Sequence, residues 1–289
     1  MSIFEAAREY PLIMQIFSFC AGACIGSFLN VCILRLPKGE SIVSPPSHCK
    51  CGKRIKWFDN IPIISWFLLR GKARCCGGKI SFRYPLVEAL TAAMFLLLWV
   101  SFEPAVAAAY MAFVSLMIFC AFVDIDTMQL PDIATVGGTL AGIALSAAIP
   151  ALHGYGAEEM HPLARHLGGL FASLAGVAVS TGVLYWIRLL SGIVFKREAM
   201  GEGDVLLIAC IGAFGGWKGG LFALFGGSVL GCVAVLPIVA AARIFGRGKS
   251  AEELEIPFGP WLALGAAVYI FISGGVDAYI ENFASALAK

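Results

Sequence analysis

Long apolar runs are the feature that most constrains how this chain can fold. A helix needs roughly 20 apolar residues to cross the hydrocarbon core of a bilayer. Candidate spans lie at 12–34, 86–102, 105–123, 133–151, 167–190, 205–217, 219–243 and 258–274. Within them the apolar residues are continuous and do not alternate with a period of two, which excludes barrel strands. The sequence therefore predicts an all-α polytopic membrane protein, a bundle of about eight transmembrane helices.

Composition and the first run support this interpretation. The chain is 59% hydrophobic and 14% charged, which excludes an ordinary soluble domain. The first run is too long for the apolar part of a signal peptide, and mixed charges, Glu5, Arg8 and Glu9, precede it. We therefore expect it to be a retained helix.

A basic segment follows the first run. Between Arg35 and Arg83 the sequence has eleven Lys and Arg residues against two acidic ones, Glu40 and Asp59. The positive-inside rule predicts that this segment is cytoplasmic, and threading the helices from it places 191–204 and 243–258 on the same side. Because the net charge is only +2, we expect no nucleic-acid partner, and we expect anionic lipid headgroups to attract the basic segment.

Three parts follow along the chain: a first transmembrane helix at 1–34, a cytoplasmic loop subdomain at 35–85 and a transmembrane core at 86–289. The loop contains an apolar stretch, 61–69, which is too short to span and is expected to lie in the membrane interface or to form a small core. Pairs of glycines four residues apart predict close helix packing. They are Gly22 with Gly26, Gly212 with Gly216 and Gly227 with Gly231.

Acidic residues lie where the predicted spans meet the cytoplasm, and such residues are functional candidates because they are costly to bury. They are Asp124, Asp126, Asp132 and Asp204. Asp124 ends an inward-running helix and Asp204 begins an outward-running one, so both carboxylates are predicted at the same membrane face. Two carboxylates that share one water can hydrolyse an amide without a metal, one as base and one as acid. Gly201 and Gly203 would let the backbone approach an extended peptide substrate.

Other roles remain open for these acids. Asp132 follows Leu130 and Pro131 and precedes a helix, so we expect it to be a helix N-cap, and Asp204 could be one as well. Asp126 could be a solvated boundary residue. Membrane acids also serve ion-coupled transporters, so a transporter is an alternative function. It predicts acids near the middle of the membrane and an internal repeat, whereas these acids lie at the ends of predicted spans and the sequence shows no repeat.

Six short segments, in this order, resemble the bacterial type IV prepilin peptidase family over nearly the whole chain. They are Gly26-Ser27-Phe28-Leu29-Asn30-Val31 with Arg35-Leu36-Pro37, Trp57-Phe58-Asp59-Asn60-Ile61-Pro62 with Ser65-Trp66, Ile80-Ser81-Phe82-Arg83-Tyr84-Pro85-Leu86-Val87-Glu88, Asp124 to Leu130-Pro131-Asp132, Gly201-Glu202-Gly203-Asp204 and Pro257-Phe258-Gly259-Pro260. The resemblance implies an aspartyl peptidase of the Gly-x-Gly-Asp class in the bacterial inner membrane, with Asp124 and Asp204 as the catalytic pair at the cytoplasmic face.

The resemblance also implies substrates and a second activity. The substrates would be type IV prepilins or type II secretion pseudopilins with a basic leader. The second activity would be methylation of the new N-terminus with S-adenosylmethionine, which we place in the loop with Arg83 and Glu88 as candidate residues. The alternative role for Glu88 is to pair with a nearby loop arginine, and a peptidase without methylation is the alternative function. Proteolysis itself needs no cofactor.

Cysteines mark a departure from the family pattern, in which two Cys-x-x-Cys pairs in the loop suit tetrahedral zinc. Here the loop has Cys49, Cys51, Cys75 and Cys76, with Ala73 where the family has cysteine. An adjacent pair is an awkward bidentate ligand, which argues against tight zinc binding, although His48 could replace one thiolate. A disulfide is not expected in the reducing cytoplasm. Leu206 is a second departure, since many relatives have lysine there.

Overall fold

The computed structural model describes residues 11–49, 51–156, 160–196, 200–244 and 256–287. The residues before the first helix and most of the predicted inner loop 243–258 lie outside these ranges. In the described residues the regular structure is helical, and β pairing is limited to the isolated bridges His48↔Arg54 and Lys72↔Lys79. The predicted all-α class is therefore confirmed. The chain forms two compact units, Met1–Phe119 and Cys120–Lys289.

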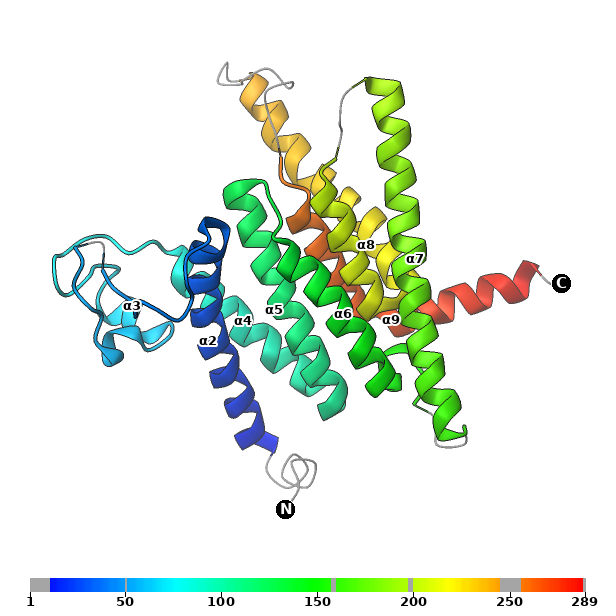
Figure 1. Cartoon of the computed structure of the whole chain (residues 1–289), viewed down its shortest axis with the longest axis horizontal. Helices are drawn as coiled ribbons and strands as arrows, with labels where there is room; N and C mark the ends of the chain where they lie inside the picture. The colour runs from blue at the N-terminus through cyan, green and yellow to red at the C-terminus, as the bar shows by residue number, and fades with distance from the viewer. Residues whose placement is uncertain (1–10, 50, 157–159, 197–199, 245–255, 288–289) are drawn as a thin grey trace. The chain divides into compact units, whose positions relative to one another are not determined.

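The first unit is built on two packed helices, α2 (Pro11–Arg35) and α4 (Arg83–Ser101), which lie side by side in Figure 1. A β-carbon added to Gly22 would lie 2.8 Å from the Ala92 Cα, and one added to Gly26 would lie 2.7 Å from the Glu88 Cα. Real β-carbons do not approach backbone so closely, so the two helices can pack at this distance only because both positions are glycine. The predicted packing role of this glycine pair is confirmed.

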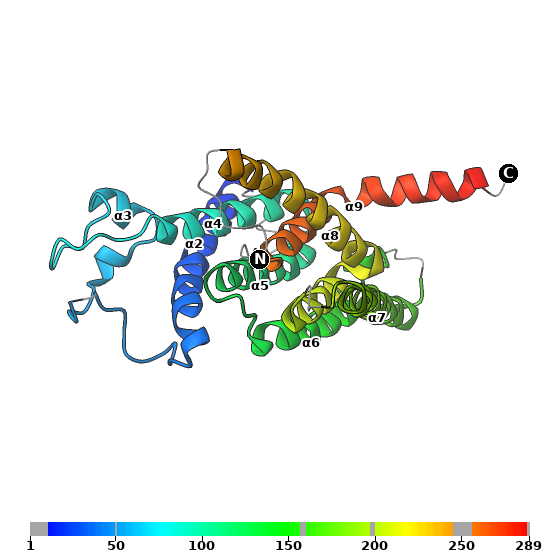
Figure 2. The same ribbon diagram turned by 90° about the horizontal axis from the view of Figure 1, so that it is seen from above.

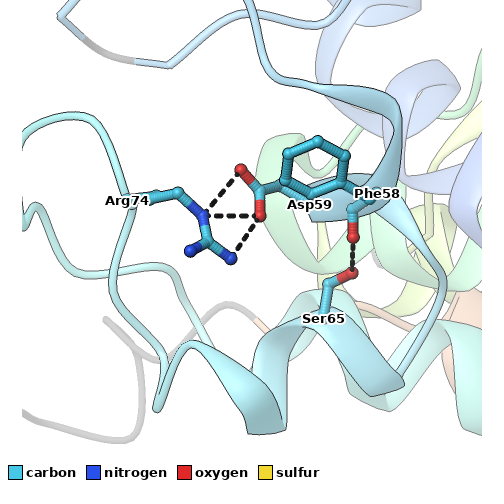
Figure 3. A network of polar contacts seen from close by, with 4 residues as sticks. All are labelled: Phe58, Asp59, Ser65 and Arg74. Carbon is cyan, nitrogen blue, oxygen red and sulfur yellow. Dashed lines mark hydrogen bonds and ion pairs between the residues drawn. The ribbon is translucent and has the colours of Figure 1, made fainter.

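The loop between α2 and α4 contains the short helices η1 (Leu36–Lys38), η2 (Trp57–Asn60) and α3 (Ile64–Leu68). The Ser65 hydroxyl donates to the Phe58 carbonyl at 3.0 Å, and Arg74 forms an ion pair with Asp59 at 2.9 Å (Figure 3). The Trp66 indole N–H donates to the Ile80 carbonyl at 3.1 Å. These polar contacts hold the loop together, but Ser65 is the one buried residue of 61–69, and the apolar side chains Ile64, Phe67 and Leu68 are exposed, so the stretch does not form the small core that was one of its two predicted roles.

The second unit follows from the end of α5 (Pro104–Thr127) and contains α6 (Asp132–Ala148), η3 (Pro150–His153), α7 (Pro162–Phe195), α8 (Glu202–Ile244) and α9 (Gly259–Leu287). Helix α8 packs against α6, α7 and α9, so it is the central element of this unit (Figures 1 and 2).

Helix α8 reverses its direction at Gly216, where the backbone leaves the helical region with φ 64° and ψ −174°. A β-carbon on Gly220 would lie 3.6 Å from the Gly212 Cα, whereas eight residues of straight helix span about 12 Å. Figure 1 shows both ends of α8, yellow-green and gold, toward the top. The predicted spans 205–217 and 219–243 are therefore two arms of a hairpin. Glycine is required at the reversal because few other residues tolerate this φ.

Six helices in the described residues are long and apolar enough to cross a membrane, and α6 is a shorter apolar helix. The hairpin α8 is one of the six, although both of its arms correspond to predicted spans. All eight predicted spans are therefore helical. Six described helices meet the length and hydropathy expected of a membrane span, because α8 contains two of the predicted spans and α6 is shorter.

Candidate active site

The first candidate carboxylate, Asp124, lies in the last turn of α5 and is only 5% exposed. Its Oδ2 atom accepts a hydrogen bond from the Gly259 backbone N–H at 2.9 Å. Gly259 is the first residue of α9, so the start of one helix meets the end of another at this carboxylate.

The second candidate carboxylate, Asp204, lies in the first turn of α8 and is 9% exposed. The backbone of Gly201 hydrogen-bonds to it, and it lies near enough to Asp124 for the two carboxylates to interact electrostatically. The structure therefore brings together the two acids that the sequence predicted at one membrane face. Each negative charge makes ionisation of the other carboxyl group less favourable, which favours one charged and one protonated carboxyl group.

The segments that carry these acids also touch each other. A β-carbon added to Gly203 would lie 3.0 Å from the Leu130 Cβ, so this glycine allows the loop after α5 to pack against the start of α8. Gly201 is exposed. The predicted contact of both glycines with a substrate stays a prediction, while packing against Leu130 is an observed role for Gly203.

The remaining acids do not join the buried pair. Asp126 and Asp132 are both exposed. The prediction that Asp132 is an N-cap is wrong: Pro131, with extended φ and ψ, is the N-cap, and Asp132 is the first helical residue. The Pro131 carbonyl accepts from the Ala134 and Thr135 N–H groups. Asp204 is likewise inside its helix and not at an N-cap position, since α8 begins at Glu202.

Glu88 has an internal role in the first unit. It is 8% exposed, and its Oε2 atom accepts the Ile63 N–H at 2.7 Å, with Ser27 as a further hydrogen-bond partner. Ile63 has a φ of 63°, an unfavourable conformation for a β-branched residue. Glu88 therefore ties the strained start of α3 to α4. Arg83 begins α4, and its N–H contacts the Ser81 hydroxyl at 3.3 Å.

The four loop cysteines form one cluster. The sulfur atoms of Cys49, Cys51, Cys75 and Cys76 all lie within 4.8 Å of one another. Cys76 lies 3.5 Å from Cys49 and Cys75 lies 3.4 Å from Cys51, so the adjacent pair reaches two different partners. In a tetrahedral site with zinc–sulfur distances of about 2.3 Å, sulfur atoms lie about 3.8 Å apart. The objection that adjacent cysteines bind one ion poorly therefore does not apply to this geometry.

The thiols also influence one another's ionisation. A hydrogen bond from the Cys51 backbone, followed by bonds from the Cys75 and Cys76 thiols, lowers the pKa of Cys49 to about 7. Hydrogen bonds to Cys49 and Cys51 raise the pKa of Cys75 to about 12. The Cys49 thiolate thus forms readily, whereas the thiols of Cys75 and Cys76, whose pKa values are raised, hold their protons more tightly.

Sequence reasoning missed two positions that contact candidate residues, one in each unit. Gly259 belongs to a segment that carries the family resemblance, but its contact with Asp124 arises from a fold that joins residues 135 positions apart. Ile63 shows no sequence signal, because an isoleucine with positive φ is visible only in the backbone.

Comparisons with known proteins give two family matches and several relatives. Residues 20–102 match the model of the bacterial peptidase A24 N-terminal domain, and residues 111–236 match that of the type IV leader peptidase family. A prepilin leader peptidase/N-methyltransferase of Myxococcus xanthus is 38% identical over 83% of this chain and 68% of its own length.

Two further relatives align over nearly their full length. The type 4 prepilin-like proteins leader peptide-processing enzyme of Escherichia coli O78:H11 is 35% identical over 93% of this chain and 98% of its own. A prepilin leader peptidase/N-methyltransferase of Dickeya chrysanthemi is 32% identical over 94% and 98%. No solved structure matches the chain significantly.

Proposed function

Because the chain belongs to the type IV leader peptidase family, we propose that it cleaves basic leaders from type IV prepilins and pseudopilins and methylates the new N-terminus. The observation that carries the peptidase proposal is the buried pair Asp124 and Asp204, which interact across the ends of α5 and α8. Residues 86–289 would form the peptidase core.

The pair hydrolyses a peptide bond when it holds one proton. The charged carboxylate takes a proton from a water molecule, and the resulting hydroxide forms a bond to the scissile carbonyl carbon. The protonated carboxyl donates its proton to the carbonyl oxygen. Collapse of the tetrahedral intermediate breaks the carbon–nitrogen bond as a carboxyl group returns a proton to the leaving amine. No metal takes part in these steps, so proteolysis needs no cofactor.

The site is proposed to face the bacterial cytoplasm from the inner membrane. The support is the basic segment between Arg35 and Arg83, which the positive-inside rule assigns to the cytoplasm. A leader that remains in the cytoplasm would then present its cleavage junction at the ends of α5 and α8, while the apolar helix that follows stays in the bilayer.

Methylation would use S-adenosylmethionine, as the names of two relatives imply. The candidate residues do not fit a donor site well, because the Glu88 carboxylate is buried and already accepts the Ile63 N–H. We therefore assign no donor contact to Glu88, and Arg83 remains a candidate. Mass spectrometry of the processed substrate decides the activity: one added methyl group on the new N-terminus supports it, and its absence leaves a peptidase without methylation.

The cysteine cluster is proposed to hold one zinc ion, since four thiols within 4.8 Å suit tetrahedral coordination. The ion would brace the loop between Cys49–Cys51 and Cys75–Cys76. Metal analysis should find about one zinc per chain, and Cys75→Ser should lose it. Cys24→Ser, an exposed thiol on α2, is the control that should keep the metal. Equal zinc contents in Cys75→Ser and Cys24→Ser would contradict this proposal.

Anionic lipid is a proposed partner of the loop. Ile64, Phe67 and Leu68 on α3 are exposed by 56%, 59% and 77%, and basic residues such as Arg70 and Lys72 follow directly. An apolar edge beside cations is typical of segments that insert into a headgroup layer. Both ends of the loop continue into membrane helices α2 and α4, which keeps it near the bilayer surface.

The peptidase proposal is tested with a leader-bearing pilin in detergent or liposomes. Asp124→Asn and Asp204→Asn should each abolish cleavage while the protein keeps its elution profile and melting temperature. Asp126→Asn removes an exposed carboxylate two residues from Asp124 and should retain cleavage. If either buried-pair variant cleaves at the normal rate, the pair is not catalytic.

A further inference from the structure

The start of α9 makes direct contact with the carboxylate pair. The Gly259 N–H donates to the Asp124 Oδ2 at 2.9 Å in a buried position. A β-carbon at residue 259 would lie 2.7 Å from that oxygen and 3.2 Å from the Asp124 Cγ. The carboxylate therefore packs directly over the Gly259 Cα, and any larger residue would push it away.

The other backbone donors in the first turn of α9 are absent or already used. Pro260 has no N–H, and the Trp261 and Leu262 N–H groups donate to the Phe258 carbonyl at 3.0 and 3.2 Å. Gly259 is thus the first-turn residue whose N–H is directed to an acid. Asp124 therefore receives the Gly259 N–H, while the N–H groups of Trp261 and Leu262 stay within the local turn.

The two aspartates differ in what their own helices provide. Asp204 lies in the first turn of α8, where a helix favours negative charge, whereas Asp124 lies in the last turn of α5, where a helix disfavours it. The start of α9 therefore supplies to Asp124 the stabilisation of negative charge that its own helix lacks. The titratable groups that interact with Asp124 include Asp204 on α8 and Cys120 on α5, and the described side chains of α9 carry no formal charge.

We infer that Gly259 is a positioning residue for the peptidase: its N–H fixes the Asp124 carboxylate and stabilises it in the charged form, so that α9 is the third element of the catalytic site. This inference rests on the proposed function of the aspartate pair. It predicts that crowding position 259 impairs the chemical step more than substrate binding.

The test compares Gly259→Ala with wild type and with Gly274→Ala, a control on the same helix where an added β-carbon meets nothing within 4 Å. Gly259→Ala should lower kcat about 10- to 100-fold with little change in KM, as expected for a disturbed hydrogen bond to a charged group. The acidic limb of its pH–rate profile should move to higher pH by roughly one unit, because the charged form is less stabilised. Gly274→Ala should match wild type in both respects.

Asp124→Asn and Asp204→Asn are measured in the same series to separate the two ideas. If both abolish cleavage while Gly259→Ala keeps the wild-type kcat and pH profile, the role of Gly259 is refuted and the aspartate pair stands. If an Asn variant cleaves normally, the peptidase proposal itself fails.

If Gly259→Ala does not elute as folded protein, Pro260→Gly replaces it. This change loosens the first turn of α9 without adding atoms beside Asp124. It should move the acidic limb in the same direction by a smaller amount, and an unchanged limb would overturn the inference.

Discussion

The hydrogen bond between Glu88 and Ile63 should determine how firmly the loop is held to α4. The Oε2–N distance of 2.7 Å and the burial of the carboxylate indicate a strong bond, and bonds of this kind contribute about 1.5–3 kcal/mol. The same turn holds Ile63 at φ 63°, a conformation that costs about 1–3 kcal/mol. The bond and the strain are therefore of similar size. Glu88→Ala should consequently release the turn from its present conformation.

Hydrogen exchange followed by mass spectrometry measures this release. In Glu88→Ala the amides around 61–65 should exchange roughly 10- to 150-fold faster, which corresponds to the lost bond energy. Glu103→Ala removes an exposed carboxylate beyond the far end of α4 and should leave the loop unchanged. Ile63→Gly should slow exchange relative to wild type, because glycine adopts this φ without strain.

The same variants test where methylation takes place. If the loop carries that activity, Glu88→Ala should lower the methylated fraction of the cleaved product while cleavage by Asp124 and Asp204 continues. Unchanged exchange around 61–65 in Glu88→Ala would refute the anchoring role. A parallel loss of cleavage and methylation would refute the division of labour between the loop and the core.

Two further predictions concern stability. Gly26→Ala should lower the melting temperature, because its β-carbon would lie 2.7 Å from the Glu88 Cα and overpacking costs about 1–3 kcal/mol. The control Gly137→Ala places its β-carbon in open space and should not lower the melting temperature. Equal melting temperatures of the two variants would contradict the close packing of α2 and α4. Burial lowers the pKa of His153 from 6.5 to about 4, so the unfolded chain binds a proton first and stability should fall as the pH drops from 6.5 to 4. His153→Gln should flatten this fall and the exposed-loop variant His48→Gln should not, as measured by melting temperature against pH.

Apolar runs predicted the positions of the helices because the polar backbone of a segment in lipid must satisfy its own hydrogen bonds, which a helix does. They also separated the two arms of the α8 hairpin as the spans 205–217 and 219–243, but the form of the reversal depends on the backbone angles of Gly216. The acid pair was predictable because each aspartate lies beside a helix boundary visible in the sequence. The N-cap prediction for Asp132 failed because Pro131 already takes the extended conformation that an N-cap needs.

Contacts that join distant segments were beyond sequence reasoning. The cysteine cluster looked doubtful because spacing along the chain was the only guide, yet folding pairs Cys75 with Cys51 and Cys76 with Cys49. Glu88 was a candidate for binding a methyl donor, since nothing in the sequence shows that its carboxylate is buried against the Ile63 N–H. In these cases the sequence showed the chemical type of each residue but not the group that it contacts in the fold.

The position of the acids along their helices separates a peptidase from a transporter. A transporter that couples to ions typically keeps its acids near the middle of the membrane, at breaks within helices. Here the break in α8 is at Gly216, twelve residues from Asp204, and both aspartates lie in the terminal turns of α5 and α8. A carboxylate pair at helix ends can meet a peptide that approaches along the membrane surface, whereas acids in the middle of a span would meet only what crosses the bilayer. The location of the pair therefore favours hydrolysis of a surface-exposed junction over transport.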